Sequence, residues 1–86
     1  MTEPYLLLDP TAWLAKTRML SPTETGIYII LISLMGPRKT PIALPEAELA
    51  DRCGCSVKVF RRGLDRLIET DLIARSDAGL VEGRHA

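Results

Sequence analysis

The chain has 86 residues, of which 47% are hydrophobic, and its 11 basic and 11 acidic side chains give a formal net charge of zero. This length fits one small domain that buries about 60–65% of its surface on folding, and the apolar content argues against a disordered chain. A zero net charge excludes a general electrostatic attraction to nucleic acid, so any such role requires local segregation of charge.

The sequence contains no sign of secretion or of membrane insertion. Its N-terminus lacks the basic flank, apolar core and small-residue cleavage site of a signal peptide. The longest apolar run, "IYIILISLM" (Ile27–Met35), is far shorter than the roughly twenty residues that span a bilayer. We therefore expect a cytoplasmic protein without membrane association, in which this run forms a buried helix.

A short first helix is predicted after an apolar N-terminal arm. Asp9 suits the N-cap of this helix, and Pro10 suits its first position, where a missing amide hydrogen leaves nothing unpaired. The helix is expected to run to about Lys16 and to place Trp13 and Leu14 against the body of the domain.

The sequence "SPTE" marks the start of a second, longer helix. It puts Ser21 at the N-cap and Glu24 at the third helical position, which is the capping-box pattern. The helix is predicted to end at Met35, because Gly36 and Pro37 together form a C-terminal stop signal.

This second helix is apolar on both faces. Its inner stripe is predicted to consist of Ile27, Ile30, Leu31 and Leu34. Ile29 and Ile32 lie on the opposite side, and we expect Tyr5–Leu8 and Trp13 to cover them. The alternative is that Ile29 and Ile32 form a surface for a homodimer or a protein partner.

Two further helices are predicted around the glycine of "DRCGCSVKVFRR". The first starts at Pro45 and Glu46 and ends at Gly54, and the second is capped by Ser56 and runs over residues 57 to about 70. The inward-facing residues are expected to be Leu49, Ala50 and Cys53 in the first, and Phe60, Leu64, Leu67 and Ile68 in the second. Residues 42–44 are predicted to form a short edge strand.

The periodicity changes after Asp71, where "LIARSDAGLVEGR" predicts two short strands joined by a turn at Ser76–Gly79. A helix, a glycine turn, a capped helix and a hairpin in this order indicate a winged helix-turn-helix, a mainly α fold with a small β-hairpin. We assign a single domain over residues 1–86. Its arm and short helix span about 1–19, its helix-turn-helix about 46–70 and its wing about 72–84.

Two cysteines, Cys53 and Cys55, flank Gly54. A four-ligand zinc site would need two more ligands, and the one histidine, His85, lies at the end of the chain. Cysteines two residues apart rarely reach disulfide geometry without strain. We therefore interpret both as small apolar residues that pack at the turn, and we expect no metal and no cofactor.

Basic residues concentrate on the helix predicted after Ser56. Between Ser56 and Ile68 there are four basic residues and one acidic residue, a local net charge of +3 in a neutral chain. Such a face suits contacts with phosphates and with the major groove, where arginine binds guanine in bidentate fashion. The candidate contacts to double-stranded DNA, or to a partner, are Ser56, Val57, Lys58, Arg61, Arg62 and Arg66 on the helix, with Arg75 and Arg84 on the wing.

A solvated basic face with no nucleic-acid partner is the other interpretation. Asp65 and Glu69 share this face, and Val57 and Val59 stand where DNA-reading helices often carry polar side chains. A protein-interaction domain that binds a host or phage replication factor, regulator or defence complex therefore stays open. No histidine within the fold, glycine-rich phosphate loop or carboxylate pair indicates catalysis, so we expect neither an enzyme nor a small-molecule substrate.

Several segments along the chain match one known family. They are Asp9, Leu14, Thr17, "LSPTETGIY" (Leu20–Tyr28), Leu31, "LP" (Leu44–Pro45), "LA" (Leu49–Ala50), "GCS" (Gly54–Ser56), Phe60, Arg61 and the final "DAGL" and arginine. With them the chain resembles the YdaU-like winged-helix family of phages and prophages, a family of unknown function often found at the start of replication-related proteins. The resemblance implies a role in DNA replication or its control, and it transfers no catalytic residues. Because the family tends to continue past the wing, we expect either a domain excerpt or a short stand-alone form.

Overall fold

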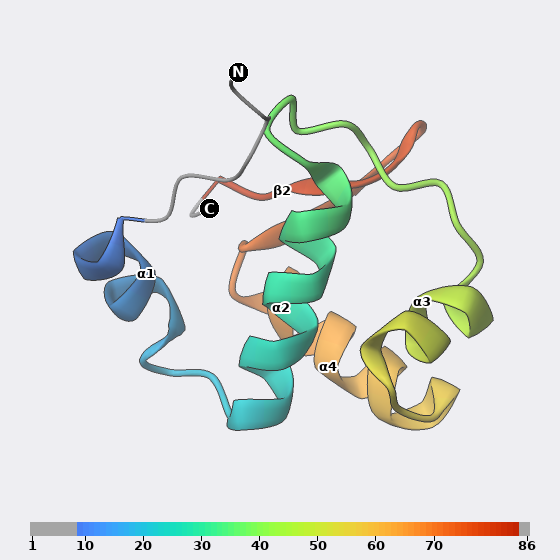
Figure 1. Cartoon of the computed structure of the whole chain (residues 1–86), viewed down its shortest axis with the longest axis horizontal. Coiled ribbons are helices and arrows are strands. Elements are labelled where there is room, and N and C mark those ends of the chain that lie inside the picture. The colour runs from blue at the N-terminus through green and yellow to red at the C-terminus, as the bar shows by residue number, and fades with distance from the viewer. Residues whose placement is uncertain (1–8, 85–86) are drawn as a thin grey trace, which may run out of the picture.

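The computed structural model describes residues 9–84, and Figure 1 shows the arrangement of its elements. In chain order these are α1 (Pro10–Thr17), α2 (Pro22–Met35), α3 (Glu46–Cys53), α4 (Val57–Glu69), β1 (Ile73–Ser76) and β2 (Gly79–Glu82). The fold is thus mainly helical with one two-stranded antiparallel hairpin, as the sequence predicts. α2 runs through the middle of the molecule, with α1 on one side and α3 on the other, and the hairpin passes behind its C-terminal half (Figure 1).

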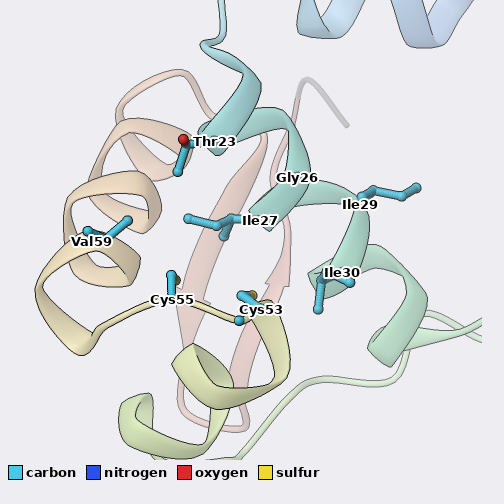
Figure 2. A pocket seen from close by; sticks show the side chains of 9 residues that line it. Thr23, Gly26, Ile27, Ile29, Ile30, Cys53, Cys55 and Val59 are labelled. Carbon is cyan, nitrogen blue, oxygen red and sulfur yellow. The ribbon is translucent and has the colours of Figure 1, made fainter.

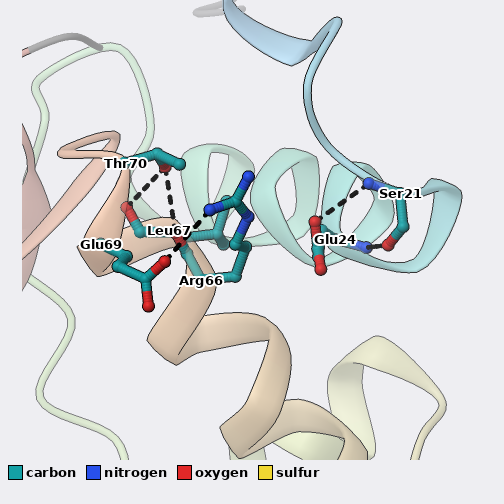
Figure 3. A network of polar contacts seen from close by, with 6 residues as sticks. All are labelled: Ser21, Glu24, Arg66, Leu67, Glu69 and Thr70. Atoms are coloured by element: carbon teal, nitrogen blue, oxygen red, sulfur yellow. Dashed lines mark hydrogen bonds and ion pairs between the residues drawn. The ribbon is translucent and has the colours of Figure 1, made fainter.

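Three of the four described helices start at the predicted caps. The Oδ1 of Asp9 accepts a hydrogen bond from an amide of α1 at 3.0 Å, and the Oγ of Ser56 accepts one from an amide of α4 at 3.1 Å. At α2, the amide of Glu24 donates to the Oγ of Ser21 at 3.1 Å and the amide of Ser21 donates to the Oε1 of Glu24 at 3.0 Å (Figure 3). Each cap of this kind stabilises a helix by about 1 kcal/mol.

An aromatic stack fastens α1 to α2. The rings of Trp13 and Tyr28 lie 5.2 Å apart, centroid to centroid, at an interplanar angle of 1°. Tyr28 is fully buried, and this burial, with a smaller contribution from the charge of Glu82, raises the pKa of Tyr28 to about 12. The prediction for Leu14 is wrong, since its side chain is 66% exposed. Trp13 takes the inward position, and successive side chains on a helix point about 100° apart.

The core lies between α2, α4 and the hairpin. Its buried apolar residues are Ile27, Tyr28, Leu31, Met35, Ile42, Leu49, Ala50, Phe60, Leu64, Leu67, Leu72, Ile73 and Leu80. The predicted stripe of α2 is correct at Ile27 and Leu31, but Ile30 and Leu34 are only half-buried. The buried residues of α2 include Tyr28 and Met35 in place of these two, and Tyr28 stacks on Trp13 of α1.

The second apolar face of α2 is partly covered. Ile32 is half-buried and packs against the core, whereas Ile29 is half-buried and lines an open groove. The cover predicted from Tyr5–Leu8 lies outside the described residues. A partner surface at Ile29 and Ile32 stays a prediction.

α4 approaches α2 closely because Gly63 has no side chain. A Cβ atom at this position would collide with the side chain of Ile27. Phe60, Leu64 and Leu67 are fully buried on the same face of α4, which also packs against α3 and β1. The charged positions of α4 are thereby left on its outer side.

Gly54 makes the tight turn between α3 and α4. Its φ of 70° and ψ of 32° place it in the left-handed region, which glycine adopts without steric cost. The amide of Cys55 donates to the carbonyl oxygen of Ala50 at 3.0 Å and so closes the end of α3. Cys53 and Cys55 are half-buried and pack against the core, as predicted.

The hairpin is joined to the preceding loop by one bridge. In the hairpin, Ile73 pairs with Glu82, Ala74 with Val81, Arg75 with Leu80 and Ser76 with Gly79. Ile42 and Leu80 exchange two backbone hydrogen bonds of 2.9 Å, so the strand predicted over residues 42–44 is reduced to this single bridge. Gly79, with a φ of 123°, permits the approach, because a Cβ atom there would collide with the backbone of Ile42.

We expect Phe60→Ala to lower the free energy of unfolding by about 3–5 kcal/mol, because it removes a fully buried ring and leaves a cavity. Val59→Ala, at the neighbouring position, is the control and should change the free energy by less than about 1 kcal/mol, since Val59 is 39% exposed. Urea denaturation followed by circular dichroism measures both. An unchanged midpoint for Phe60→Ala would show that the register of α4 is misplaced.

A second pair of variants tests the two turns. Gly54→Ala should destabilise by about 1–2 kcal/mol, because its φ is left-handed while the space around it is open. Gly79→Ala should cost more, because its Cβ atom meets backbone that cannot move without breaking the bridge between Ile42 and Leu80. Thermal unfolding of the two variants side by side gives the comparison. Equal losses would argue against the close packing of Ile42 on the hairpin.

Candidate functional site

The outer side of α4 carries the basic residues that the sequence singles out. Its inner stripe is fixed by the buried residues of the core, so Lys58, Arg61 and Arg62 are exposed and Arg66 is half-buried. The helix is strongly amphipathic, with its apolar face against α2 and α3. The predicted orientation of this face is therefore correct, whereas its role in binding stays a prediction.

Three of the predicted contact arginines are held in ion pairs. Arg61 joins α4 to α3 through Glu46 at 3.0 Å, and Arg84 joins the end of the hairpin to Asp71 at 3.0 Å. The hydrogen bonds and the charge of Glu46 raise the pKa of Arg61. These are exposed pairs, each of which contributes little to stability. These two pairs neutralise Arg61 and Arg84, which the sequence alone suggests are free to bind a partner.

The third pair lies within α4. Arg66 donates to Glu69 at 3.1 Å, one turn further along the helix, as Figure 3 shows. Glu69, which the sequence places on this face, thus pairs with a cation at the C-terminal half of α4. The positive charge of α4 is concentrated in its N-terminal half.

Lys58, Arg62 and Arg75 make no ion pair with any other residue in the range 9–84. Arg62 lines a shallow depression of about 300 Å³ between α4 and the start of α2. Glu24 lines the same depression, but its Oε1 accepts the hydrogen bond of the α2 cap. Arg75 is exposed on β1 and lines a separate depression beside Ile42.

Ser56 and the two valines of α4 have different environments. Ser56 is exposed, but its Oγ is engaged in capping α4. Val57 is half-buried and packs against the core, which leaves it little surface for a partner. Val59 is exposed and lies between the depression at Arg62 and a larger apolar groove.

This groove, between α2 and the turn from α3 to α4, has a volume of about 510 Å³ (Figure 2). Its lining residues are Thr23, Gly26, Ile27, Ile29, Ile30, Cys53, Gly54, Cys55 and Val59. In Figure 2 Ile27 points toward α4, Ile30 points toward the turn, and Ile29 points away along the side of α2. Ile29 and both cysteines stand out in the sequence, but no sequence pattern brings them together. No motif signals the groove, because its two walls are more than twenty residues apart in the chain.

The remaining chemistry of the described region is limited. Burial, and secondarily the proximity of Cys55, raises the pKa of Cys53, so its thiol is held in the protonated form. Within residues 9–84, no three or more His, Cys, Asp or Glu side chains gather where they could hold a metal ion. None of the helices in this range has the length and apolar character needed to cross a membrane.

These features define a small, mainly helical domain with a β-hairpin, whose last helix presents a basic N-terminal half beside an apolar groove. The chain matches the model of a family described as a protein of unknown function (DUF1376) over residues 4–80, and it belongs to that family. No curated protein and no solved structure gives a significant match.

Proposed function

We propose that the chain is a winged helix-turn-helix domain that binds double-stranded DNA through α4 and the hairpin. The succession of α3, a glycine turn, a capped α4 and an antiparallel hairpin supports this, because it is the order of elements in that fold. In this proposal β1 and β2 form the wing. The resemblance to the YdaU-like family supports a phage or prophage origin and a role in DNA replication or its control.

One observation carries the proposal. Lys58 and Arg62 are exposed one helical turn apart, and neither has a carboxylate partner among the described residues of a chain whose net charge is zero. Cations of this kind bind phosphate without first giving up an ion pair, and they release counterions from DNA when they do so.

The ion pairs divide the proposed contacts into two groups. Lys58, Arg62 and Arg75 meet the phosphates directly. Arg61, Arg66 and Arg84 must exchange a carboxylate for a phosphate, so that each contributes less net binding free energy. Because Val57 packs inward and Val59 is apolar, α4 offers few side chains for reading base edges, so the proposed binding rests mainly on phosphate contacts.

Titration of fluorescent duplex DNA of random sequence, followed by anisotropy at several salt concentrations, tests the proposal. We expect Lys58→Ala and Arg62→Ala each to weaken binding and to reduce the slope of log K against log salt by about 0.9, the value for one lost phosphate contact. Arg18→Ala is the control, since Arg18 is an exposed arginine at the C-cap of α1 and belongs to neither α4 nor the hairpin. Binding without salt dependence, or an equal loss in the control, would refute the proposal.

The apolar groove beside α4 favours a second function, which is protein binding. In this function Lys58 and Arg62 meet carboxylates of a host or phage protein instead of phosphates. Affinity capture from a host extract distinguishes the two. Tight, salt-dependent DNA binding with no stoichiometric protein partner would count against the second function.

A further inference from the structure

The groove between α2 and the α3–α4 turn contains a glycine that the packing of the protein does not require. Gly26 lies in the interior of α2, where glycine is less favourable than alanine by about 0.5–1 kcal/mol. Apart from its two chain neighbours and the backbone of α2 itself, no atom lies within 4 Å of a Cβ placed there, and its φ is not left-handed. Gly63 differs, because the Ile27 side chain fills the space beside it. The missing side chain of Gly26 therefore leaves an open apolar depression, not a close helix contact.

The walls of this depression are aliphatic. Ile30 stands one turn further along α2, and Cys55 and Val59 close the opposite side, as Figure 2 shows. The chemistry of these walls suits one branched aliphatic or aromatic side chain, since all three groups are apolar or weakly polar.

The end of the groove near the start of α2 carries one cation, Arg62, and one carboxylate, Glu24, whose Oε1 is already engaged in the α2 cap. Thr23 and Val59 line both the groove and the neighbouring depression that contains Arg62, so the two form one continuous surface. Arg62 and Lys58 lack carboxylate partners among the described residues, and Lys58 is exposed one turn before Arg62 on α4. An occupant that matches this surface has an apolar side chain over Gly26 and a carboxylate at Arg62.

We infer that this surface binds a segment of a partner protein in which an aliphatic or aromatic residue is flanked by Asp or Glu. The apolar side chain lies over Gly26, between Ile30 and Val59. The flanking carboxylate forms an ion pair with Arg62. The inference does not rest on DNA binding, because its apolar half uses none of the proposed DNA contacts.

Two synthetic, end-blocked peptides are the probes. Both carry leucines at helical spacing. The first peptide has glutamate at all of the remaining positions, and the second has lysine in place of each glutamate. Titration of the ¹⁵N-labelled protein should shift the backbone amides of Gly26, Ile30 and Cys55 with the glutamate peptide and leave them unshifted with the lysine peptide. Shifts elsewhere only, or equal shifts with both peptides, overturn the inference.

Variants separate the apolar from the charged part of the surface. Gly26→Leu fills the depression and improves helix propensity, so it should fold and lose peptide binding. Ala47→Leu adds the same side chain at an exposed position of α3 that does not line the groove, and it should bind normally. Arg62→Ala should weaken peptide binding by about tenfold, equivalent to roughly 1.4 kcal/mol. Undiminished peptide binding by Gly26→Leu overturns the inference. Val59→Asp places a charge in the opposite wall of the groove and should also lose binding of the glutamate peptide.

The same variants keep this inference distinct from the proposed function. Gly26→Leu leaves Lys58 and Arg62 in place and should therefore retain salt-dependent DNA binding while it loses the glutamate peptide. If DNA binding is absent and the peptide still binds in the groove, the proposed function fails and the inference stands. If DNA binds and no peptide shift occurs at Gly26, the inference alone fails.

Discussion

The close approach of α4 to α2 at Gly63 is the contact on which the other features depend. The end of the Ile27 side chain occupies the space that a Cβ of Gly63 would take, so α2 packs here on the bare backbone of α4. Phe60 and Leu64 are then buried on either side of this contact, and the rotation of α4 about its axis is fixed. Lys58 and Arg62 are exposed as a consequence of that rotation and not through any interaction of their own.

The same contact creates the groove. With α4 held against α2, Val59 stands opposite Thr23 and Gly26, and the tight turn at Gly54 places Cys55 on the same side of the groove as Val59. The two glycines of the α2–α4 region thus have opposite effects. The Ile27 side chain fills the space beside Gly63. Gly26 leaves a depression that nothing in the described part of the chain fills.

Local signals predicted the secondary structure well. The capping box at Ser21 and Glu24, the cap at Ser56 and the turn at Gly54 each depend on neighbours within a few residues, and the structure confirms all three. The inner face of α2 was predicted less well. Its periodicity alone does not reveal that Trp13 covers Tyr28 from a separate helix.

The properties of the site depend on contacts that are remote in sequence. Arg61 and Glu46 are fifteen positions apart, and Arg84 and Asp71 are thirteen apart, so helical spacing could not show that these arginines are neutralised. Periodicity predicted which direction each cation faces, but only the fold reveals which carboxylate lies beside it. For this reason the candidate contacts narrow from six cations to Lys58, Arg62 and Arg75 once the ion pairs are known.

Arg62 belongs to both proposed surfaces, and this has a thermodynamic consequence. A guanidinium group that is paired with a carboxylate in the groove is not available to a DNA phosphate, so the two ligands oppose each other at that side chain. Thermodynamic linkage requires the effect to be reciprocal, so that each ligand lowers the affinity for the other by the same factor. Only three of the proposed DNA-contacting cations, Lys58, Arg62 and Arg75, lack an ion pair among the described residues, so loss of the contact at Arg62 removes a large share of the proposed attraction for DNA. If both proposals hold, a partner protein that fills the groove releases the domain from DNA without any change in its fold.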